Sequence, residues 1–224
     1  MSSEEREFVL TLVLQVEKAV RPGQTDALET AARAVLAILA DERSAGDGEW
    51  AAAMRDWQDA RIRKVVRRAR GAEWRRASAL AGITVTGTTA VVRVFPPVPL
   101  DEVPKDLAKL QVTGTDLEDP EPPGEPEPGT PVLWVNPQLE MSTGKTMAQV
   151  GHAAHLAWLD LPAAARKTWQ SADFPVAVRT ATAPHWSALL RTGLPVVQDA
   201  GFTEVEPGSC TVIADHPALL GREY

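Results

Sequence analysis

The sequence lacks two features that would assign it to a secreted or a membrane class. It holds a single cysteine, Cys210, which excludes an intramolecular disulfide framework and a four-cysteine zinc site and favours a reducing compartment. No apolar run approaches the roughly 20 residues that an α-helix needs to cross a bilayer, and the first residues are acidic where a secretory leader has a basic flank. We therefore expect a cytoplasmic protein without a membrane partner.

An excess of positive charge is also missing, because the formal net charge is −7. The distribution of the charges is more informative than their sum. Residues 61–76 contain eight Lys and Arg side chains and one Glu, whereas residues 115–130 contain six Asp and Glu side chains and no cation. The negative total therefore does not exclude a nucleic-acid partner, since one segment is strongly basic.

The acidic segment is also rich in proline, which predicts a linker over residues 116–130. Prolines remove backbone donors and like charges repel, so this stretch favours an extended, semi-rigid spacer. A chain of 224 residues has room for one large or two small domains. The linker favours two, an N-terminal domain over residues 1–115 and a C-terminal domain over residues 131–224. Comparison of the two halves by eye reveals no internal repeat.

The N-terminal half shows mostly helical spacing of its apolar residues. Steps of three and four residues predict helices over residues 8–20, 25–39 and 48–70. Residues 83–95 are rich in Val and Thr around Gly87, which is typical of a β-hairpin. We therefore expect a mainly α-helical N-terminal region with one β-hairpin.

The C-terminal half alternates strand and helix signals instead. This alternation predicts a compact three-layer α/β domain with a mixed, partly parallel sheet. The expected strands cover residues 132–135, 175–180, 196–197 and 210–214, and the expected helices cover residues 143–159 and 183–191.

The helix expected at residue 143 begins with a pattern suited to an anion. The first turn of a helix has unpaired N–H groups and a positive dipole end, so Gly144 and Lys145 are placed to bind a negative group. The run Gly144-Lys145-Thr146 matches the end of a nucleotide-binding P-loop. That motif requires glycine where this chain has Leu139, which argues against a P-loop.

Three polar residues follow one stripe of this helix. Lys145, Gln149 and His152 stand at steps of four and three residues on an otherwise alanine-rich helix, as expected for a site. The alternative is that Gln149 and His152 are interior polar groups with backbone partners. His152 and His155 have metal-ligand spacing, but no cysteine or carboxylate stands nearby, so we expect neither a metal nor a cofactor.

Several spaced motifs of the C-terminal half follow one order. They read Leu139-x-Met141-x-x-Gly144-Lys145-x-x-Ala148-Gln149-x-x-His152-Ala153, then Asp199-Ala200-Gly201-x-Thr203, then Gly208-Ser209-x-Thr211-Val212. The series resembles peptidyl-tRNA hydrolase of the second class, the type typical of archaea and eukaryotes, over residues 131–217. Taken alone, Asp199-Ala200-Gly201 is more typical of a simple turn.

The resemblance implies metal-independent hydrolysis of the ester that joins a peptide or N-blocked amino acid to tRNA. It makes tRNA the expected partner and implies that the domain often forms a homodimer. The family's catalytic lysine, aspartate and hydroxyl residue fall on Lys145, Asp199 and Thr203. The positions expected to bind substrate are Gly144, Gln149, His152 and Thr211.

The chain departs from the family pattern at several places. Asn136 and Gln138 replace a basic residue and an aspartate, Thr143 stands where a second lysine is common, and His216-Pro217 replaces Gly-Pro. Two positive positions are thus lost at the expected phosphate-binding face. The alternative function is a catalytically inactive tRNA-binding, RNA-binding or regulatory module on the same fold.

The basic segment offers a compensation for this loss. Residues 61–76 are predicted to form an amphipathic helix whose arginines bind phosphates of tRNA, with Arg63, Arg67 and Arg70 as the expected contacts. The alternative is a solvated surface whose cations pair with acidic residues of the N-terminal half or the linker. A third interpretation makes residues 1–115 a protein-interaction module.

Overall fold

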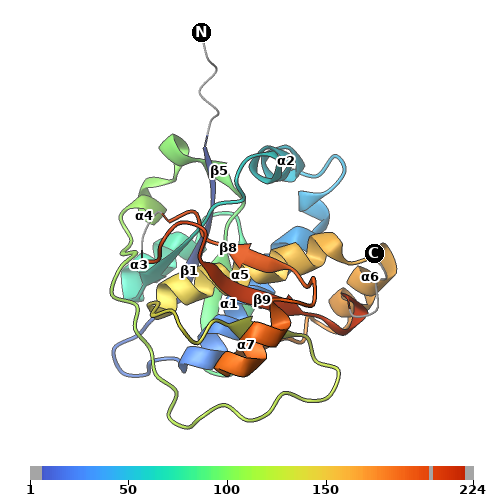
Figure 1. Ribbon diagram of the computed structural model, residues 1–224. Helices are drawn as coiled ribbons and strands as arrows, with labels where there is room; N and C mark the ends of the chain where they lie inside the picture. The colour runs from blue at the N-terminus through green and yellow to red at the C-terminus, as the bar shows by residue number, and fades with distance from the viewer. Residues whose placement is uncertain (1–6, 202–203, 220–224) are drawn as a thin grey trace.

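The computed structural model describes residues 7–201 and 204–219, and its centre is a pair of long helices between two sheets (Figure 1). Helix α1 (Gln24–Ala40) and helix α5 (Thr143–Asp160) pack along each other. Helix α1 contacts strands β3 and β4 of the first sheet and β7 of the second, whereas α5 contacts β8 and β9 of the second sheet and β2 of the first. Each helix thus joins the two sheets.

The first sheet belongs to the N-terminal half and has the strand order β2-β1-β4-β3. Strands β1 and β2 are parallel, and the β1–β4 and β3–β4 pairs are antiparallel. Its strands are β1 (Phe8–Gln15), β2 (Lys64–Ala69), β3 (Ile83–Thr86) and β4 (Val91–Val94), with β5 (Val98–Pro99) paired to the start of β1.

The second sheet belongs to the C-terminal half and has the order β7-β6-β9-β8. Strands β6 and β7 are parallel, and the β6–β9 and β8–β9 pairs are antiparallel. Its strands are β6 (Val132–Val135), β7 (Ala177–Thr180), β8 (Val196–Gln198) and β9 (Cys210–Asp215). The α/β class with mixed, partly parallel sheets is confirmed.

The two sheets have the same strand order and the same strand directions. The correspondence extends to the long helices: counted from the helix starts at Gln24 and Thr143, all nine buried residues of α1 fall on buried residues of α5. The first turn differs, because Asp26 of α1 stands at the position of Lys145 in α5. The fold therefore repeats although no repeat is visible in the sequence.

The helix predicted over residues 8–20 is wrong, because residues 8–15 form strand β1. This strand lies between β2 and β4, and its side chains from Val9 to Leu14 are buried on both faces. A strand covered on both faces is a continuous apolar run, whose spacing does not separate it from a buried helix.

The basic helix predicted over residues 61–76 is also wrong. Residues 64–69 form the edge strand β2, and helix α3 (Gly71–Ser78) begins at Gly71, where φ is +48°. The helix expected over residues 48–70 is α2 (Ala51–Asp59) alone. The N-terminal region is consequently mixed α/β rather than mainly helical, while the hairpin over residues 83–95 is confirmed as β3–β4.

The C-terminal elements follow the prediction closely. Helix α5 ends before Leu161-Pro162, α7 (Ala183–Leu189) lies where a helix was expected, and α6 (Ala163–Ser171) is additional. The short remaining elements are α4 (Lys105–Ala108) and the 3₁₀ turns Glu42–Ser44, Leu100–Glu102 and Pro217–Leu219. No helix in the described part of the chain has the length and apolar content to span a bilayer.

The acidic linker, residues 116–130, lies against both halves of the molecule and contains no helix or strand (Figure 1). Leu117 is buried and donates its N–H to Thr143 Oγ1. The Asp119 carboxylate accepts the N–H and the hydroxyl of Thr25 at the start of α1. One hydrophobic core contains residues of both halves. The division into domains at the linker stays a prediction.

Candidate active site

The first turn of α5 and the end of β8 bring a lysine and an aspartate into contact. Ser142 caps the helix by accepting the N–H of Lys145 on its side-chain oxygen. Lys145 Nζ lies 2.6 Å from Asp199 Oδ2, and the side chains are only 11% and 8% exposed. A salt bridge so close and so sheltered holds both groups in one orientation.

Two further polar groups fix the orientation of this pair. Gln149, one turn along α5 from Lys145, donates from Nε2 to Asp199 Oδ2 at 2.9 Å, and its Oε1 accepts the hydroxyl of Thr211 on β9 at 2.5 Å. Because a carboxylate only accepts hydrogen bonds, the donor end of the amide faces the aspartate and its oxygen is left for the Thr211 hydroxyl. The other carboxylate oxygen, Asp199 Oδ1, accepts the N–H of Gly201. The Asp199 carboxylate thus has three donors.

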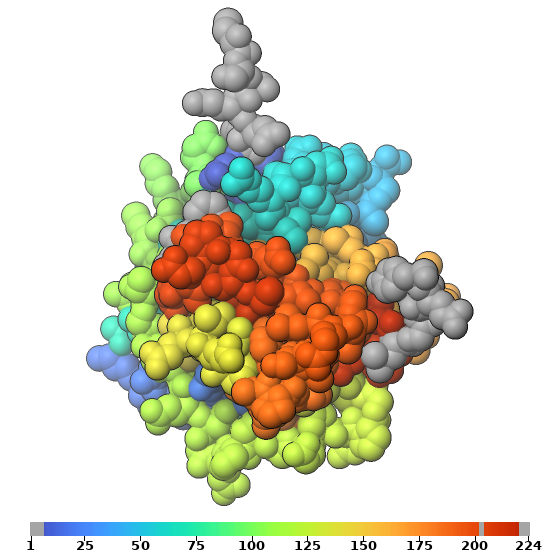
Figure 2. Space-filling view, viewed as in Figure 1, coloured from blue at the N-terminus to red at the C-terminus, as the bar shows by residue number. Residues whose placement is uncertain are grey.

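The backbone groups at the start of α5 already have partners within the chain. The N–H of Gly144 donates to the carbonyl of Thr115, so the expected anion contact at Gly144 is not available. The N–H and hydroxyl of Ser142 both donate to the Glu204 carboxylate at 2.7 Å. The β8–β9 loop and the segment before α5 meet at the surface (Figure 2). Attraction for an anion at this end therefore comes from the Lys145 side chain.

The comparison with known families concerns the part of the chain that holds this cluster. Residues 130–220 match the family model of peptidyl-tRNA hydrolase PTH2. The resemblance drawn from the motifs is confirmed, and the C-terminal part carries a PTH2 domain. That domain contains Lys145, Gln149, Asp199 and Thr211 together with all of the second sheet. No family model matches the N-terminal part.

The residues that depart from the PTH2 pattern have structural partners. Asn136 donates from Nδ2 to the carbonyl of Cys210 and accepts the N–H of Gln138, which fixes the turn after β6. Thr143 accepts the N–H of Leu117 from the linker. His216 accepts the N–H of Ala218 on Nδ1. These side chains therefore support the backbone.

Thr203 lies outside the described residues, and His152 lies apart from the cluster. His152 Nε2 is 2.9 Å from the carbonyl oxygen of Ile62 in the N-terminal half. Burial lowers the pKa of His152 well below its ordinary value, and the charge of Lys64 adds to the effect. His152 is therefore an interior polar group with a backbone partner, which was the alternative to a site residue. Gln149, in contrast, contacts Asp199 together with Lys145.

A second buried polar cluster lies where the PTH2 domain meets the N-terminal half. Lys64 Nζ of β2 is 3.2 Å from His155 Nδ1 and 4.6 Å from the ring centroid of Trp57, and the His155 ring stacks on that indole. Desolvation lowers the pKa of Lys64 well below its ordinary value. Desolvation first, and then the charge of Lys64, lower the pKa of His155 to about 2. No local pattern predicts this contact, because its residues are far apart in the chain.

His155 makes stability depend on pH. In the unfolded chain it binds a proton near pH 6.5 and in the folded protein only near pH 2, so stability is lost as the pH falls below 6.5. We expect His155 to lower the free energy of unfolding by about 2 kcal/mol between pH 7 and pH 5. Urea unfolding of His155→Leu should show a pH dependence flatter by that amount.

The matched control for this measurement is His185→Gln, since His185 is exposed on α7. Its pH dependence should equal that of the wild type. His152 contributes in the same direction in all three proteins, so only the difference between them reports on His155. Identical slopes for His155→Leu and the wild type would contradict the assignment.

The three arginines expected to bind tRNA do not form one row. Arg63 pairs with Glu7 at 3.1 Å, and Arg67 donates to the carbonyls of Ala108 and Leu110. Burial lowers the pKa of Arg67. Arg70 is exposed just before α3. In an extended segment Arg63 and Arg67 share one face and Arg70 lies on the other, whereas a helix would place all three along one side.

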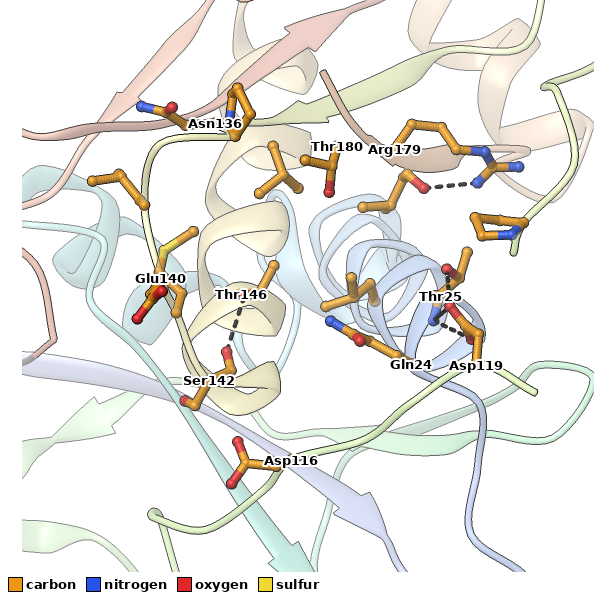
Figure 3. Close-up of a pocket in the computed structure, with 17 residues that line it drawn as sticks. Gln24, Thr25, Asp116, Asp119, Asn136, Glu140, Ser142, Thr146, Arg179 and Thr180 are labelled. Carbon is orange, nitrogen blue, oxygen red and sulfur yellow. Dashed lines mark hydrogen bonds between the residues drawn. The ribbon is translucent and has the colours of Figure 1, made fainter. Parts of the chain in front are cut away.

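A cavity of about 590 Å³ lies on the other side of the first turn of α5 (Figure 3). Thr146 lines it, whereas Lys145 of the same turn contacts Asp199 outside it. Its polar lining comes from the starts of both long helices, the linker and the ends of β6 and β7, and includes Gln24, Thr25, Asp116, Asp119, Asn136, Glu140, Ser142, Arg179 and Thr180.

Proposed function

We propose that this protein hydrolyses the ester bond between tRNA and a peptide or an N-blocked amino acid. The observation that carries the proposal is the sheltered contact of Lys145, Gln149 and Asp199 inside a PTH2 domain. Two of these residues come from one helix and the third from a strand end 50 residues away in the chain. If Asp199 belonged only to a simple turn, its carboxylate would not need to contact Lys145 and Gln149.

The cluster has the groups that ester hydrolysis needs. Water attacks the ester carbonyl carbon, the bond from that carbon to the ribose oxygen of tRNA breaks, and a proton from the water ends on that oxygen. Asp199 accepts a hydrogen bond from the attacking water and orients it, while Lys145 stabilises the negative charge that develops on the carbonyl oxygen. Gln149 keeps the carboxylate in place. Thr203 is proposed as the third catalytic residue from the family pattern.

The same proposal includes the partner and the setting of the reaction. The partner is tRNA, whose phosphates Lys145 attracts, and Thr211 supports substrate binding through Gln149. The reaction uses no metal, takes place in the cytoplasm and is compatible with a homodimer. The contact of Lys145 with Asp199 favours an enzyme over an inactive RNA-binding module, since binding to phosphates gains nothing from a carboxylate.

The test is release of the blocked amino acid from N-acetyl-aminoacyl-tRNA by the purified chain of 224 residues. The negative control is the double variant Lys145→Ala/Asp199→Ala purified in the same way, so that a contaminating hydrolase appears in both samples. We expect turnover by the wild type alone. Binding of tRNA without turnover would replace the proposal by the inactive binding module.

A further inference from the structure

Arg68 lies on the face of β2 that packs against α5. Side chains alternate along a strand, so Lys64 and Arg68 point to the same side. Lys64 contacts α5, since its Nζ is 3.2 Å from His155 Nδ1 and its Cδ would lie 3.7 Å from a Cβ on Gly151. Arg68 therefore extends from the N-terminal half toward α5.

The direction of β2 places Arg68 at the start of α5. The backbone of Arg68 pairs with Gln111, and the segment that follows, residues 112–115, crosses the first turn of α5. There the carbonyl of Thr115 accepts the N–H of Gly144. Arg68 Nη2 would lie 3.5 Å from a Cβ on Gly114, the neighbour of Thr115. The guanidinium is thus near the turn that carries Lys145.

The charge of Arg68 is not neutralised within the described residues. Its side chain makes no hydrogen bond or ion pair there, and its Nε is buried without a partner. Two neighbouring cations have carboxylate partners, since Arg63 pairs with Glu7 and Arg76 with Asp106, while Arg67 donates from Nη1 to two carbonyls. A half-buried guanidinium with free donors beside a site is suited to a phosphate, which it binds with two hydrogen bonds at once.

We propose that Arg68 binds a phosphate of tRNA next to Lys145, so that the N-terminal half supplies part of the substrate site. This inference rests on the proposed function. It also accounts for Thr143, where the resemblance leads one to expect a second lysine: that side chain bonds to Leu117 of the linker, and Arg68 provides the missing positive charge from another strand.

The test compares Arg68→Gln, Arg68→Lys and the control Arg61→Gln in the chain of 224 residues. Arg61 is exposed at the other end of β2 and loses the same charge. Affinity for deacylated tRNA is measured from 50 to 200 mM salt, together with kcat and KM for N-acetyl-aminoacyl-tRNA. We expect Arg68→Gln to weaken tRNA binding by about five- to tenfold and to reduce the salt slope by about 0.7–0.9, the share of one phosphate.

The remaining variants separate a phosphate contact from a structural role. Arg68→Lys should recover most of the salt slope, Arg61→Gln should match the wild type, and the loss in Arg68→Gln should fall on KM rather than kcat. Turnover with unchanged affinity in Arg68→Gln overturns this inference and leaves the proposed function intact. Binding of tRNA that depends on Arg68, without turnover, overturns the proposed function and leaves this inference intact. A wild type that binds no tRNA overturns both the inference and the proposed function.

Discussion

Replacement of Lys145 by methionine is expected to lower kcat for N-acetyl-aminoacyl-tRNA hydrolysis by about 10²–10³-fold, the usual cost of losing one donor to a developing oxyanion. Methionine keeps the length and apolar stem of the lysine and removes its charge. Asp199→Asn keeps the shape of the carboxylate but weakens its hold on water, and should lose about 10²–10⁴-fold. Each single variant should leave folding intact, because the cluster lies at a helix end and a loop.

The measurement is kcat and KM for both variants, with Lys167→Met as the matched control on the exposed face of α6. The double variant Lys145→Met/Asp199→Asn should lose little more of its kcat than either single variant, since the two groups act as a unit across a 2.6 Å contact. Retention of wild-type kcat by either single variant would remove that residue from the mechanism.

Trp57→Ala is expected to lower the free energy of unfolding by about 3–5 kcal/mol, the range for deleting a fully buried tryptophan. Trp57 has no exposed surface, stacks on His155 of α5, and donates from Nε1 to the carbonyl of Arg63. The variant loses this packing and the indole hydrogen bond, although the Arg63 carbonyl keeps the N–H of Leu10, and it removes the aromatic ring beside Lys64 and His155. Because the indole belongs to the N-terminal half and the imidazole to the PTH2 domain, both halves should lose stability together.

Urea unfolding followed by circular dichroism measures this loss, and Trp74→Ala is the control. Trp74 is only half-buried, on α3, and packs against the smaller second core. Trp74→Ala should lower the free energy of unfolding by clearly less than Trp57→Ala. Two separate transitions in Trp57→Ala, with only the first one shifted, would show that the halves unfold independently and would contradict the shared core.

The predictability of the fold differed between the halves for a physical reason. In the C-terminal half, strand and helix signals alternate, and these local signals predicted most elements correctly. Strands β1 and β2 carry no such signal. The first is buried on both faces, and the second carries its arginines between Val65 and Ala69, so neither shows the alternation of a half-exposed strand.

The candidate site was only partly within reach of the sequence. Lys145 and Gln149 are four residues apart on one helix, which local spacing predicts. Asp199 is joined to them by tertiary packing, so only the resemblance to a family located it. His152 stands on the same predicted stripe, yet the N-terminal half supplies Ile62 as its partner. Arg68 depends on the course of β2 against α5, which no local pattern contains.

The repeated topology has a consequence for the number of sites that one chain offers. At the position of Lys145, the N-terminal half has Asp26, which accepts the N–H groups of Thr88, Thr89 and Ala90 from the tight β3–β4 turn. The short β3–β4 turn packs directly on this carboxylate. The N-terminal half therefore has neither the lysine of α5 nor a connection as long as the β8–β9 loop. The strand order is thus repeated, whereas among the described residues the lysine–aspartate contact lies in the C-terminal half alone, and we expect one chain to bind one substrate molecule.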